Sequence, residues 1–465
     1  MSTTAGSGVA VMAIDTPALG DRSYLAHDGE VALVIDPQRD IDRVLALAVG
    51  RGVRITHVFE THLHNDYVTG GLALALATGA AYHVNAADAV AFDRVPVADG
   101  DVVQVSPVMR IRVLATPGHT FTHLSYVLQA VGQVPAVFTG GSLLYGSTGR
   151  PDLLGHVHAD ELAHAQFTSA HRLAAELPED AKVYPTHGFG SFCSATQSEA
   201  SSSTIGRERR VNPVLTQAED RYVSELLAGL DVYPAYYAHM GPANAAGPSD
   251  ADLSPPRRAD GAELRRRVDA GEWVVDLRAR RAFAAGHVAG TLSFDLDGSF
   301  ATYLGWLIPW GTPLTLLGQT PGQVAGAQRE LVRIGIDRPA GAATGHPGDW
   351  AGGRALRSYP VADFAGLESV RRHRPVVILD VRRDQEWNAA HISGAIHIPL
   401  HRLPACLAEV PAGEVWVHCQ SGYRASIAAS FLDAAGRTVV AVDDEYIQAA
   451  RAGLPIDAHL ADAAT

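Results

Sequence analysis

One segment limits the possible folds of this chain more than any other segment does. It spans residues 60–71 and reads Glu-Thr-His-Leu-His-Asn-Asp-Tyr-Val-Thr-Gly-Gly. It follows an apolar, β-branched run and precedes an Ala- and Leu-rich stretch, so we expect a loop between a strand and a helix. Side chains alternate along an extended chain, so His62, His64 and Asp66 can point in related directions at the strand end. Imidazole and carboxylate groups so placed predict a metal site.

Further potential ligands follow other predicted strands. His119 lies in Thr-Pro-Gly-His-Thr after an apolar run, and His187 lies in Pro-Thr-His-Gly after another. Loops on one rim of a sheet are where binding sites are commonly built. The sequence therefore predicts one metal site formed by His62, His64, Asp66, His119 and His187.

The composition restricts the class of protein. A length of 465 residues predicts two to four domains, and 47% hydrophobic with 19% charged residues is typical of globular domains. The net charge of −13 argues against nucleic-acid binding. Three cysteines exclude a disulfide framework, and with no signal-peptide pattern at the N-terminus we expect a cytoplasmic protein. The apolar residues 68–84 are rich in Gly and Ala and predict a buried helix, so we expect no membrane partner.

The histidine pattern resembles the metallo-β-lactamase superfamily, whose signature is Thr-His-x-His-x-Asp-His with later ligands. Thr-Pro-Gly-His119-Thr, Gly-Arg150-Pro-Asp152-Leu and Pro-Thr-His187-Gly look most like the persulfide dioxygenase branch. The resemblance implies an αββα sandwich over residues 1–240. It also implies one divalent metal, Fe(II) favoured with Zn(II) as the alternative, bound first by His62 and His119.

Two positions depart from the family pattern. The turn that supplies a carboxylate ligand in the family, Thr-Gly-Asp, ends here in Gly141, and the final histidine of the signature is Tyr67. Three histidines remain as a neutral set, which would bind zinc readily and iron less tightly. Asp66 or Asp152 could supply a carboxylate, and we expect Gly141→Asp to tighten iron binding. A metal-free domain that has kept its histidines is the alternative.

A polar, basic segment, residues 201–210, ends this predicted domain. The resemblance implies that Arg207 and Arg210 receive the carboxylates of a glutathione-like thiol, because guanidinium groups bind carboxylates in bidentate fashion. A solvated connector is the alternative interpretation. Residues 241–258, which contain Pro, Gly and Asn, are predicted to be a linker.

The C-terminal part of the chain contains an internal repeat. Val-Val-Asp-Leu-Arg at 274–278 and the following His-Val-Ala-Gly match Ile-Leu-Asp-Val-Arg at 378–382 and His-Ile-Ser-Gly at a constant offset of 104 residues. Residues 314–335 match 415–436 at an offset of 101. Apolar strands alternate with Ala-rich helices in both copies, which predicts two α/β domains over residues 259–350 and 351–465.

A cysteine loop in the second copy, His-Cys-Gln-Ser-Gly-Tyr-Arg, lies between a strand and a helix. The helix N-terminus and Arg424 both favour the thiolate of Cys419. The loop resembles rhodaneses, which implies a persulfide on Cys419 cradled by Gln420, Ser421, Gly422 and Tyr423. A phosphatase loop is the nearest alternative, but it has one more residue between Cys and Arg than this loop has.

The first copy has Gly-Gln-Thr-Pro-Gly-Gln at residues 318–323, without the Cys or the Arg, so we predict that it is inactive. Neither Cys193 nor Cys406 has a comparable setting.

The whole chain thus resembles bacterial persulfide dioxygenase–rhodanese fusions. The resemblance implies two reactions, metal-dependent oxidation of a small thiol persulfide to sulfite and sulfur transfer from thiosulfate at Cys419. A homo-oligomer is a further possibility that the resemblance leaves open. Three alternatives remain. They are a thioester hydrolase with zinc on three histidines, a sulfurtransferase with a metal-free first domain, and a sulfur-sensing protein without turnover.

Overall fold

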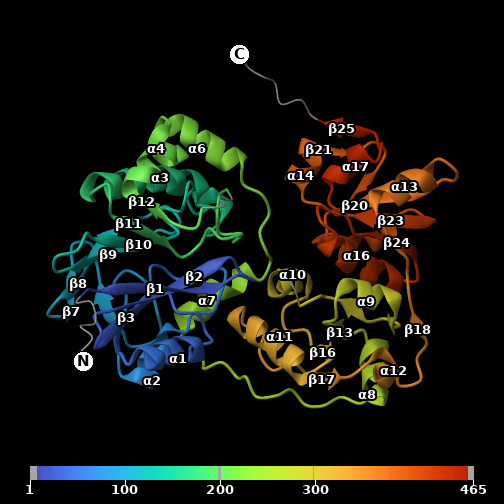
Figure 1. Cartoon of the computed structure of the whole chain (residues 1–465), viewed down its shortest axis with the longest axis horizontal. Helices are drawn as coiled ribbons and strands as arrows, with labels where there is room; N and C mark the ends of the chain where they lie inside the picture. Colours follow the sequence, from blue (N-terminus) through green and yellow to red (C-terminus); the bar gives the residue numbers. More distant parts are fainter. Residues whose placement is uncertain (1–7, 197–199, 297, 459–465) are drawn as a thin grey trace, which may run out of the picture. The chain divides into compact units, whose positions relative to one another are not determined.

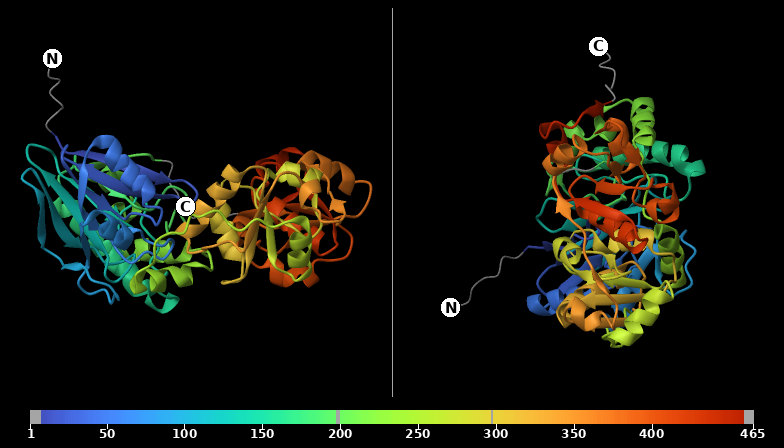
Figure 2. Two further views of the ribbon diagram at one scale, coloured as in Figure 1. Left: turned by 90° about the horizontal axis from the view of Figure 1, so that it is seen from below. Right: turned by 90° about the vertical axis from the view of Figure 1, so that its right-hand side faces the viewer.

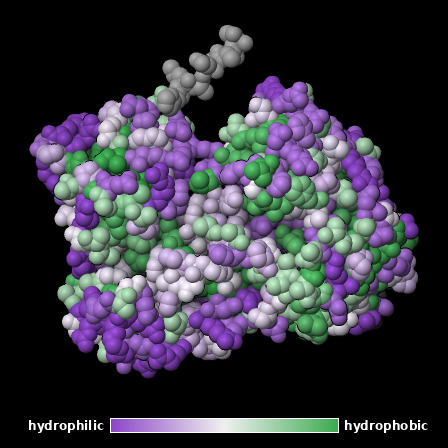
Figure 3. Space-filling view, turned by 180° about the vertical axis from the view of Figure 1, so that it is seen from behind, coloured by the Kyte–Doolittle hydropathy of each residue, from purple (hydrophilic) through white to green (hydrophobic). Residues whose placement is uncertain are grey.

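The computed structural model describes residues 8–196, 200–296 and 298–458 (Figure 1). The chain divides into two compact units, Met1–Asp252 with Val332–Gly335 and Leu253–Leu331 with Ile336–Thr465. No helix in the described part of the chain is long and apolar enough to cross a membrane. Hydrophilic residues cover much of the face shown in Figure 3, with hydrophobic residues scattered among them, as is usual for folded domains.

The first unit contains two six-stranded sheets. The first sheet has, in spatial order, β1 (Ala10–Thr16), β2 (Asp21–His27), β3 (Val31–Ile35), β4 (Arg54–Phe59), β5 (Ala81–Asn85) and β6 (Val95–Val97). The second sheet has β12 (Ser203–Thr204), β11 (Lys182–Pro185), β10 (Ala136–Gly140), β9 (Leu124–Ala130), β8 (Met109–Ala115) and β7 (Val102–Ser106). Helices lie outside both sheets, as the blue-to-green part of Figure 2 shows.

Three apolar cores establish four layers. Phe59 of the first sheet packs with Ile111 and Phe138 of the second, which makes the core between the sheets. Another core joins the first sheet to α1 (Asp42–Arg51) and α2 (Gly71–Thr78). The third joins the second sheet to the helices α3 (Ala159–Glu176), α4 (Ile205–Val211), α5 (Pro213–Thr216) and α6 (Glu219–Ala228). The predicted αββα sandwich is confirmed.

The histidine segment lies where the sequence places it, between β4 and α2. Strands β3, β4 and β5 are parallel, so the loops that leave β3 and β4 reach the same edge of the first sheet. Strands β10 and β11 of the second sheet are also parallel, and the loop after β11 carries His187.

The predicted linker starts too early, because residues 241–246 belong to helix α7 (Tyr237–Ala246), with Pro242 inside it. The helix is held by Asn244, which is fully buried. Its amide nitrogen donates to the carbonyls of His64 (2.8 Å) and Tyr67 (2.9 Å), and its carbonyl accepts from the Thr69 N–H. Helix α7 therefore holds the histidine loop in place. These contacts stabilise the helix although Pro242, which disfavours a helix interior, lies inside it.

Among the described residues, the second unit has a four-stranded and a five-stranded parallel sheet flanked by helices, and two antiparallel two-stranded sheets. Its division into two α/β domains stays a prediction. The first half has α8 (Gly261–Asp269), β13 (Trp273–Asp276), α9 (Arg280–Ala285), β15 (Leu292–Ser293), α10 (Phe300–Leu307), β16 (Leu314–Gly318), α11 (Pro321–Arg333), β17 (Gly341–Thr344) and α12 (Pro347–Trp350). The second half has β19 (Val361–Ala362), α13 (Phe364–Arg371), β20 (Val377–Asp380), α14 (Asp384–Ala389), β22 (Ile396–His397), α15 (Leu403–Cys406), β23 (Glu414–His418), α16 (Tyr423–Ala434), β24 (Thr438–Val442) and α17 (Ile447–Arg451). The spatial orders are β15-β13-β16-β17 and β19-β24-β23-β20-β22.

Strand registers confirm the internal repeat. Asp276 of β13 pairs with Leu317, and Asp380 of β20 pairs with His418, which reproduces both sequence offsets. Both aspartates also make the same side-chain contact. Nη2 of Arg278 donates to the carboxylate of Asp276 at 2.6 Å, and Nη2 of Arg382 donates to that of Asp380 at 2.6 Å. The two halves therefore share strand register as well as sequence.

Candidate functional site

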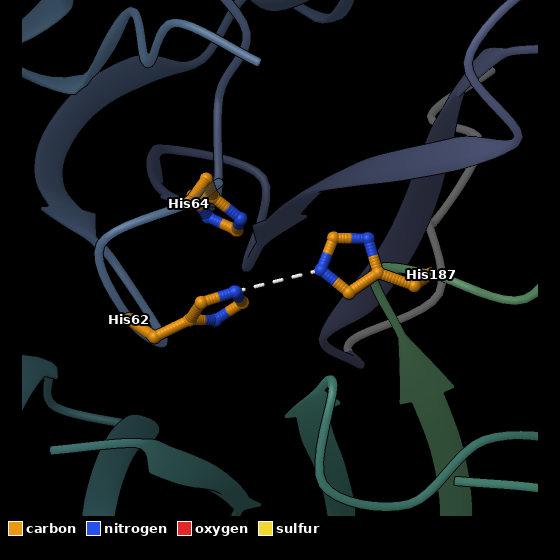
Figure 4. A group of neighbouring side chains, drawn as sticks. All are labelled: His62, His64 and His187. Carbon is orange, nitrogen blue, oxygen red and sulfur yellow. Dashed lines mark hydrogen bonds between the residues drawn. The ribbon is translucent and has the colours of Figure 1, made fainter. Parts of the chain in front are cut away.

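The imidazoles of the four predicted histidine ligands meet inside the first unit together with that of His123, whose ring centroid lies 5.0 Å from His62, and each is at most 1% exposed. The ring centroids of His62 lie 4.1 Å from His64, 4.8 Å from His119 and 5.4 Å from His187. Figure 4 shows His62 and His187 pointing toward each other, with their Nε2 atoms 3.5 Å apart. The four predicted histidine ligands are thus brought together, and the fifth predicted ligand, Asp66, has a carboxylate oxygen 3.2 Å from His187 Nδ1.

The hydrogen bonds at the back of the rings fix where their lone pairs lie. Thr61 Oγ1 donates to Asp36, so it can only accept from Nδ1 of His62, 2.9 Å away. Nδ1 of His119 likewise donates to the carbonyl of Arg150 at 2.9 Å. The Nε2 lone pairs of His62 and His119 are therefore left to face the cluster. This arrangement, with one ring nitrogen held and the other free, is the usual one for metal-binding histidines.

Charge in the cluster is unevenly distributed. Burial lowers the pKa of His187, but Asp66 and the hydrogen bond that Nδ1 donates to Asp21 outweigh it and raise the pKa to about 10. Burial and the neighbouring His187 lower the pKa of His119 to about 3, and burial also lowers the pKa of His62 well below its ordinary value. Burial also lowers the pKa of His64, but Asp36 and Glu60 outweigh it and raise this pKa to about 9. Without a metal the cluster thus contains two cationic rings, His64 and His187, beside neutral ones.

The donor set fits a divalent metal ion. Nε2 of His119, Nδ1 of His64 and Oδ1 of Asp66 are buried without a hydrogen-bond partner, while Oδ2 of Asp66 pairs with His187. Buried polar atoms without a partner are costly, and a cation would satisfy these. Imidazole nitrogens suit zinc and iron alike, so this set does not separate the two metals.

The two departures from the family pattern have structural consequences. A Cβ atom at Gly141 would lie 2.2 Å from Cδ2 of His119, so the ring of His119 occupies the space that an aspartate would need. The hydroxyl of Tyr67 lies 2.9 Å from Nε2 of His64, and this nitrogen also lies 3.3 Å from a carboxylate oxygen of Asp36 and of Glu60. Gly141→Asp could therefore restore a ligand only if the ring of His119 moves.

Cys193 is a member of the cluster that the sequence did not reveal. It is fully buried, and its sulfur and one ring nitrogen each of His119 and His187 all lie within 4.8 Å of one another. The sequence offered only its position six residues after His187.

Arg207 and Arg210 lie on α4, and both side chains are exposed. Arg207 lines a cavity of about 620 Å³ together with Arg22, Lys182 and Tyr145. None of the five predicted metal ligands is among the residues that line this cavity. A role for the two arginines in binding a thiol therefore stays a prediction.

In the second unit the predicted cysteine loop connects β23 to α16. Cys419 is 2% exposed and follows the last residue of the strand. Gly422 has φ +87°, and a Cβ atom there would lie 2.3 Å from a carboxylate oxygen of Asp443, so only glycine fits the turn. The register places Gly318 of the first half where Cys419 lies in the second, which agrees with the predicted loss of the nucleophile.

Arg424 has a partner that the sequence did not predict. Its Nη1 and Nη2 donate to the two carboxylate oxygens of Glu386 on α14, at 2.6 and 2.7 Å. Burial would raise the pKa of Glu386, but the hydrogen bonds and charge of Arg424 outweigh burial and lower it to about 2. The arginine is thereby held beside the loop in a fixed orientation.

A cavity of about 600 Å³ opens at this loop, and both halves of the second unit line it. The second half contributes Arg383, Glu386, Gln420, Ser421, Tyr423, Arg424 and Glu445. The first half contributes Arg280, Gly298, Ser299 and Tyr303. Two further contacts join the halves there, from Arg280 to Asp443 at 2.8 Å and from the hydroxyl of Tyr423 to the carbonyl of Asp295 at 3.0 Å. The half without a nucleophile therefore forms part of the cavity.

Comparisons with known proteins place both sites in families. The family model of the metallo-beta-lactamase superfamily matches residues 21–187, and that of the rhodanese-like domain matches residues 367–446. A hydroxyacylglutathione hydrolase of Pseudomonas entomophila (strain L48) is 32% identical over 40% of this chain and 77% of that protein. The chain belongs to the metallo-β-lactamase superfamily.

Two more relatives extend this result. The mitochondrial persulfide dioxygenase ETHE1 of Homo sapiens is 28% identical over 48% of this chain and 83% of that protein. The crystal structure of a metallo-beta-lactamase from Staphylococcus aureus subsp. aureus COL is 27% identical, with a TM-score of 0.65, over 72% of this chain and 99% of that chain. The chain spans only 57% of the length of two other hydroxyacylglutathione hydrolases that it matches. A superfamily domain followed by a rhodanese-like domain is thus shown.

Proposed function

We propose that this chain is an enzyme of persulfide metabolism in which sulfur is transferred at Cys419 and a thiol persulfide is oxidised in the first unit. One observation carries the proposal: the intact cysteine loop, with Arg424 fixed by Glu386, borders a cavity that also contains Arg280 and Arg383. Three guanidinium groups at one cavity suit a small dianion such as thiosulfate.

At the cysteine loop the thiolate of Cys419 would attack the outer sulfur of thiosulfate. The S–S bond of thiosulfate breaks, sulfite leaves with the bonding electron pair, and Cys419 keeps the sulfane sulfur as a persulfide. A small thiol then takes this sulfur and regenerates the thiolate. The arginines hold the dianion and the departing sulfite, while the loop backbone faces the persulfide.

In the first unit a metal held by the histidine cluster would activate O₂ and the sulfur of a thiol persulfide. The overall reaction is RSSH + O₂ + H₂O → RSH + SO₃²⁻ + 2H⁺. The chain's own contribution is to exclude water, since all four imidazoles are buried, and to fix the rings through Thr61, Arg150 and Asp21. We favour Fe(II) because the reaction needs a redox metal. The persulfide dioxygenase among the relatives supports this reaction.

A second candidate function, hydrolysis of a glutathione thioester, is favoured by the hydroxyacylglutathione hydrolases among the relatives. The histidine cluster would hold zinc for this reaction, because imidazole nitrogens suit zinc once they have lost their protons, and zinc would supply the activation of water.

Metal analysis of the purified full chain, paired with an oxygen electrode, distinguishes the two functions. About one iron per chain with O₂ uptake on adding a glutathione persulfide supports the proposal. Stoichiometric zinc with cleavage of a glutathione thioester and no O₂ uptake would replace it with the second candidate. The Cys419→Ala variant is the matched control, because it should lose thiosulfate turnover and keep O₂ uptake.

A further inference from the structure

We propose that the thiolate of Cys193 is a metal ligand that replaces the carboxylate missing at Gly141. The inference rests on the proposed metal-dependent function of the first unit, but it concerns how the metal is held and applies whichever reaction follows. It adds a sulfur donor to a set that the sequence pattern limits to imidazoles and carboxylates.

The backbone places Cys193 beside the position of the missing ligand. The N–H of Gly149 donates to the carbonyl of Gly141 at 2.8 Å, and Gly149 also forms a β-bridge with Ser194. The segments around residues 141, 149 and 194 therefore run side by side. A residue next to Ser194 therefore lies near position 141 and near the ring of His119, which packs against Gly141.

Arg150 connects Cys193 to the histidine cluster. Its N–H donates to the carbonyl of Cys193 at 2.8 Å, and its own carbonyl accepts from Nδ1 of His119 at 2.9 Å. One residue thus fixes both the cysteine and the ring whose Nε2 is buried without a partner. That unpartnered nitrogen is the independent sign that a ligand belongs next to the sulfur.

The distances are compatible with a single ion. Metal bonds of about 2.0 Å to nitrogen and 2.3 Å to sulfur place tetrahedral ligand atoms roughly 3.3 to 3.8 Å apart. The sulfur of Cys193 and the ring nitrogens of His119 and His187 all lie within 4.8 Å of one another, so small rotations of the side chains close the set. Binding replaces the S–H bond with an S–metal bond, and the proton passes to solvent.

The carboxylates nearby are less suited to the vacant position. Asp152 accepts two hydrogen bonds from Arg150, at 2.7 and 2.8 Å, so its oxygens are engaged. Asp66 lies at the Nδ1 side of His187, opposite the Nε2 atom that faces His62. The polar groups that face the thiol are Asp66, Asp21 and Tyr237. Cys193 is the remaining soft donor at the cluster.

Cobalt substitution of the full chain tests the ligand directly. We expect Co(II) added to metal-free protein to give visible d–d bands and a near-ultraviolet sulfur-to-cobalt charge-transfer band. Cys193→Ser should abolish the charge-transfer band, keep the d–d bands and weaken cobalt binding about tenfold or more, the loss typical of disturbed ligand spheres. Cys406→Ser and Cys419→Ser are the matched controls and should keep the band, because neither thiol belongs to the cluster.

The outcomes distinguish a failure of the proposed thiolate ligand from a failure of the proposed metal-dependent function. Visible bands without a charge-transfer band in the wild-type protein, or a band lost only with Cys406 or Cys419, would overturn the thiolate ligand and leave the metal-dependent function standing. No uptake of cobalt would overturn both. If Cys193→Ser does not fold, cadmium NMR of the wild-type protein decides, since one sulfur ligand shifts the resonance away from that of a site made of nitrogen and oxygen alone.

Discussion

Neutralising Glu386 should loosen the cysteine loop, because this carboxylate is the bidentate partner of Arg424. The side chains of Arg424 and Glu386 are 10% and 19% exposed, so water screens the pair only in part. Glutamine keeps the size of the side chain and removes its charge. Arg424 then retains a single neutral acceptor and stays largely buried.

The pKa of Glu386 sets the expected magnitude. Its lowering from 4.5 to about 2 corresponds to about 3 kcal/mol of folding free energy at neutral pH. A carboxyl with a depressed pKa stabilises the fold fully above its unfolded value. This stabilisation is lost as the pH falls from about 4.5 toward 2, and about 2 kcal/mol of it remains at pH 3.5. The Glu386→Gln protein should therefore differ most from wild type at pH 7.

Differential scanning calorimetry of the full chain measures the effect. We expect Glu386→Gln to lower the midpoint of the transition of the second unit by about 5 to 10 °C at pH 7, as about 2 to 3 kcal/mol implies for a unit of this size. Glu445→Gln is the control, because Glu445 lines the same cavity and is exposed. Equal midpoints for the two variants at pH 7, or a gap to wild type that widens toward pH 3.5, would refute the reasoning.

Four other outcomes follow from the geometry. Cys419→Ala should abolish sulfur transfer from thiosulfate to cyanide, and residual transfer would place the nucleophile elsewhere. Arg280→Gln should raise KM for thiosulfate about fivefold, equivalent to about 1 kcal/mol, whereas Arg281→Gln should not, because both bind Asp443 but only Arg280 lines the cavity. Removing metal with a chelator should lower the unfolding temperature of the first unit, and readdition should restore it. Gly141→Asp should weaken metal binding in equilibrium dialysis, since the new Cβ displaces the ring of His119; tighter binding would contradict the clash.

Features that depend on local pattern were predictable from the sequence. The αββα sandwich was expected from the resemblance to the metallo-β-lactamase superfamily, and the four histidines were picked out by that signature and by their positions after predicted strands. The repeat was predictable because the two copies lie in the same chain and can be aligned with each other directly. Strand pairing then confirms it, since Asp276 and Asp380 meet corresponding residues of the neighbouring strand.

Partners from distant segments were not predictable, because no local spacing encodes them. Glu386 lies 38 residues before Arg424, and Asn244 lies 180 residues after His64. The predicted linker fails for the same reason: Pro242 signals a helix end locally, while the contacts of Asn244 hold the helix on the histidine loop. Cys193 has no flanking motif, and contacts of its segment with Gly149 and Arg150 bring it to the cluster.

The glycine at position 141 and the proposed thiolate of Cys193 fit one description of the metal site. A side chain at position 141 and the present position of the His119 ring exclude each other sterically. With the ring in this position, one of its nitrogens lies within 4.8 Å of the sulfur of Cys193. A thiolate carries the same charge as a carboxylate, so a Cys193 ligand would give the ligand set the charge that an aspartate would give, and it would move the preference of the site toward softer metals. In this proposal Gly141 leaves room for the ring of His119, and Cys193 supplies the anionic ligand.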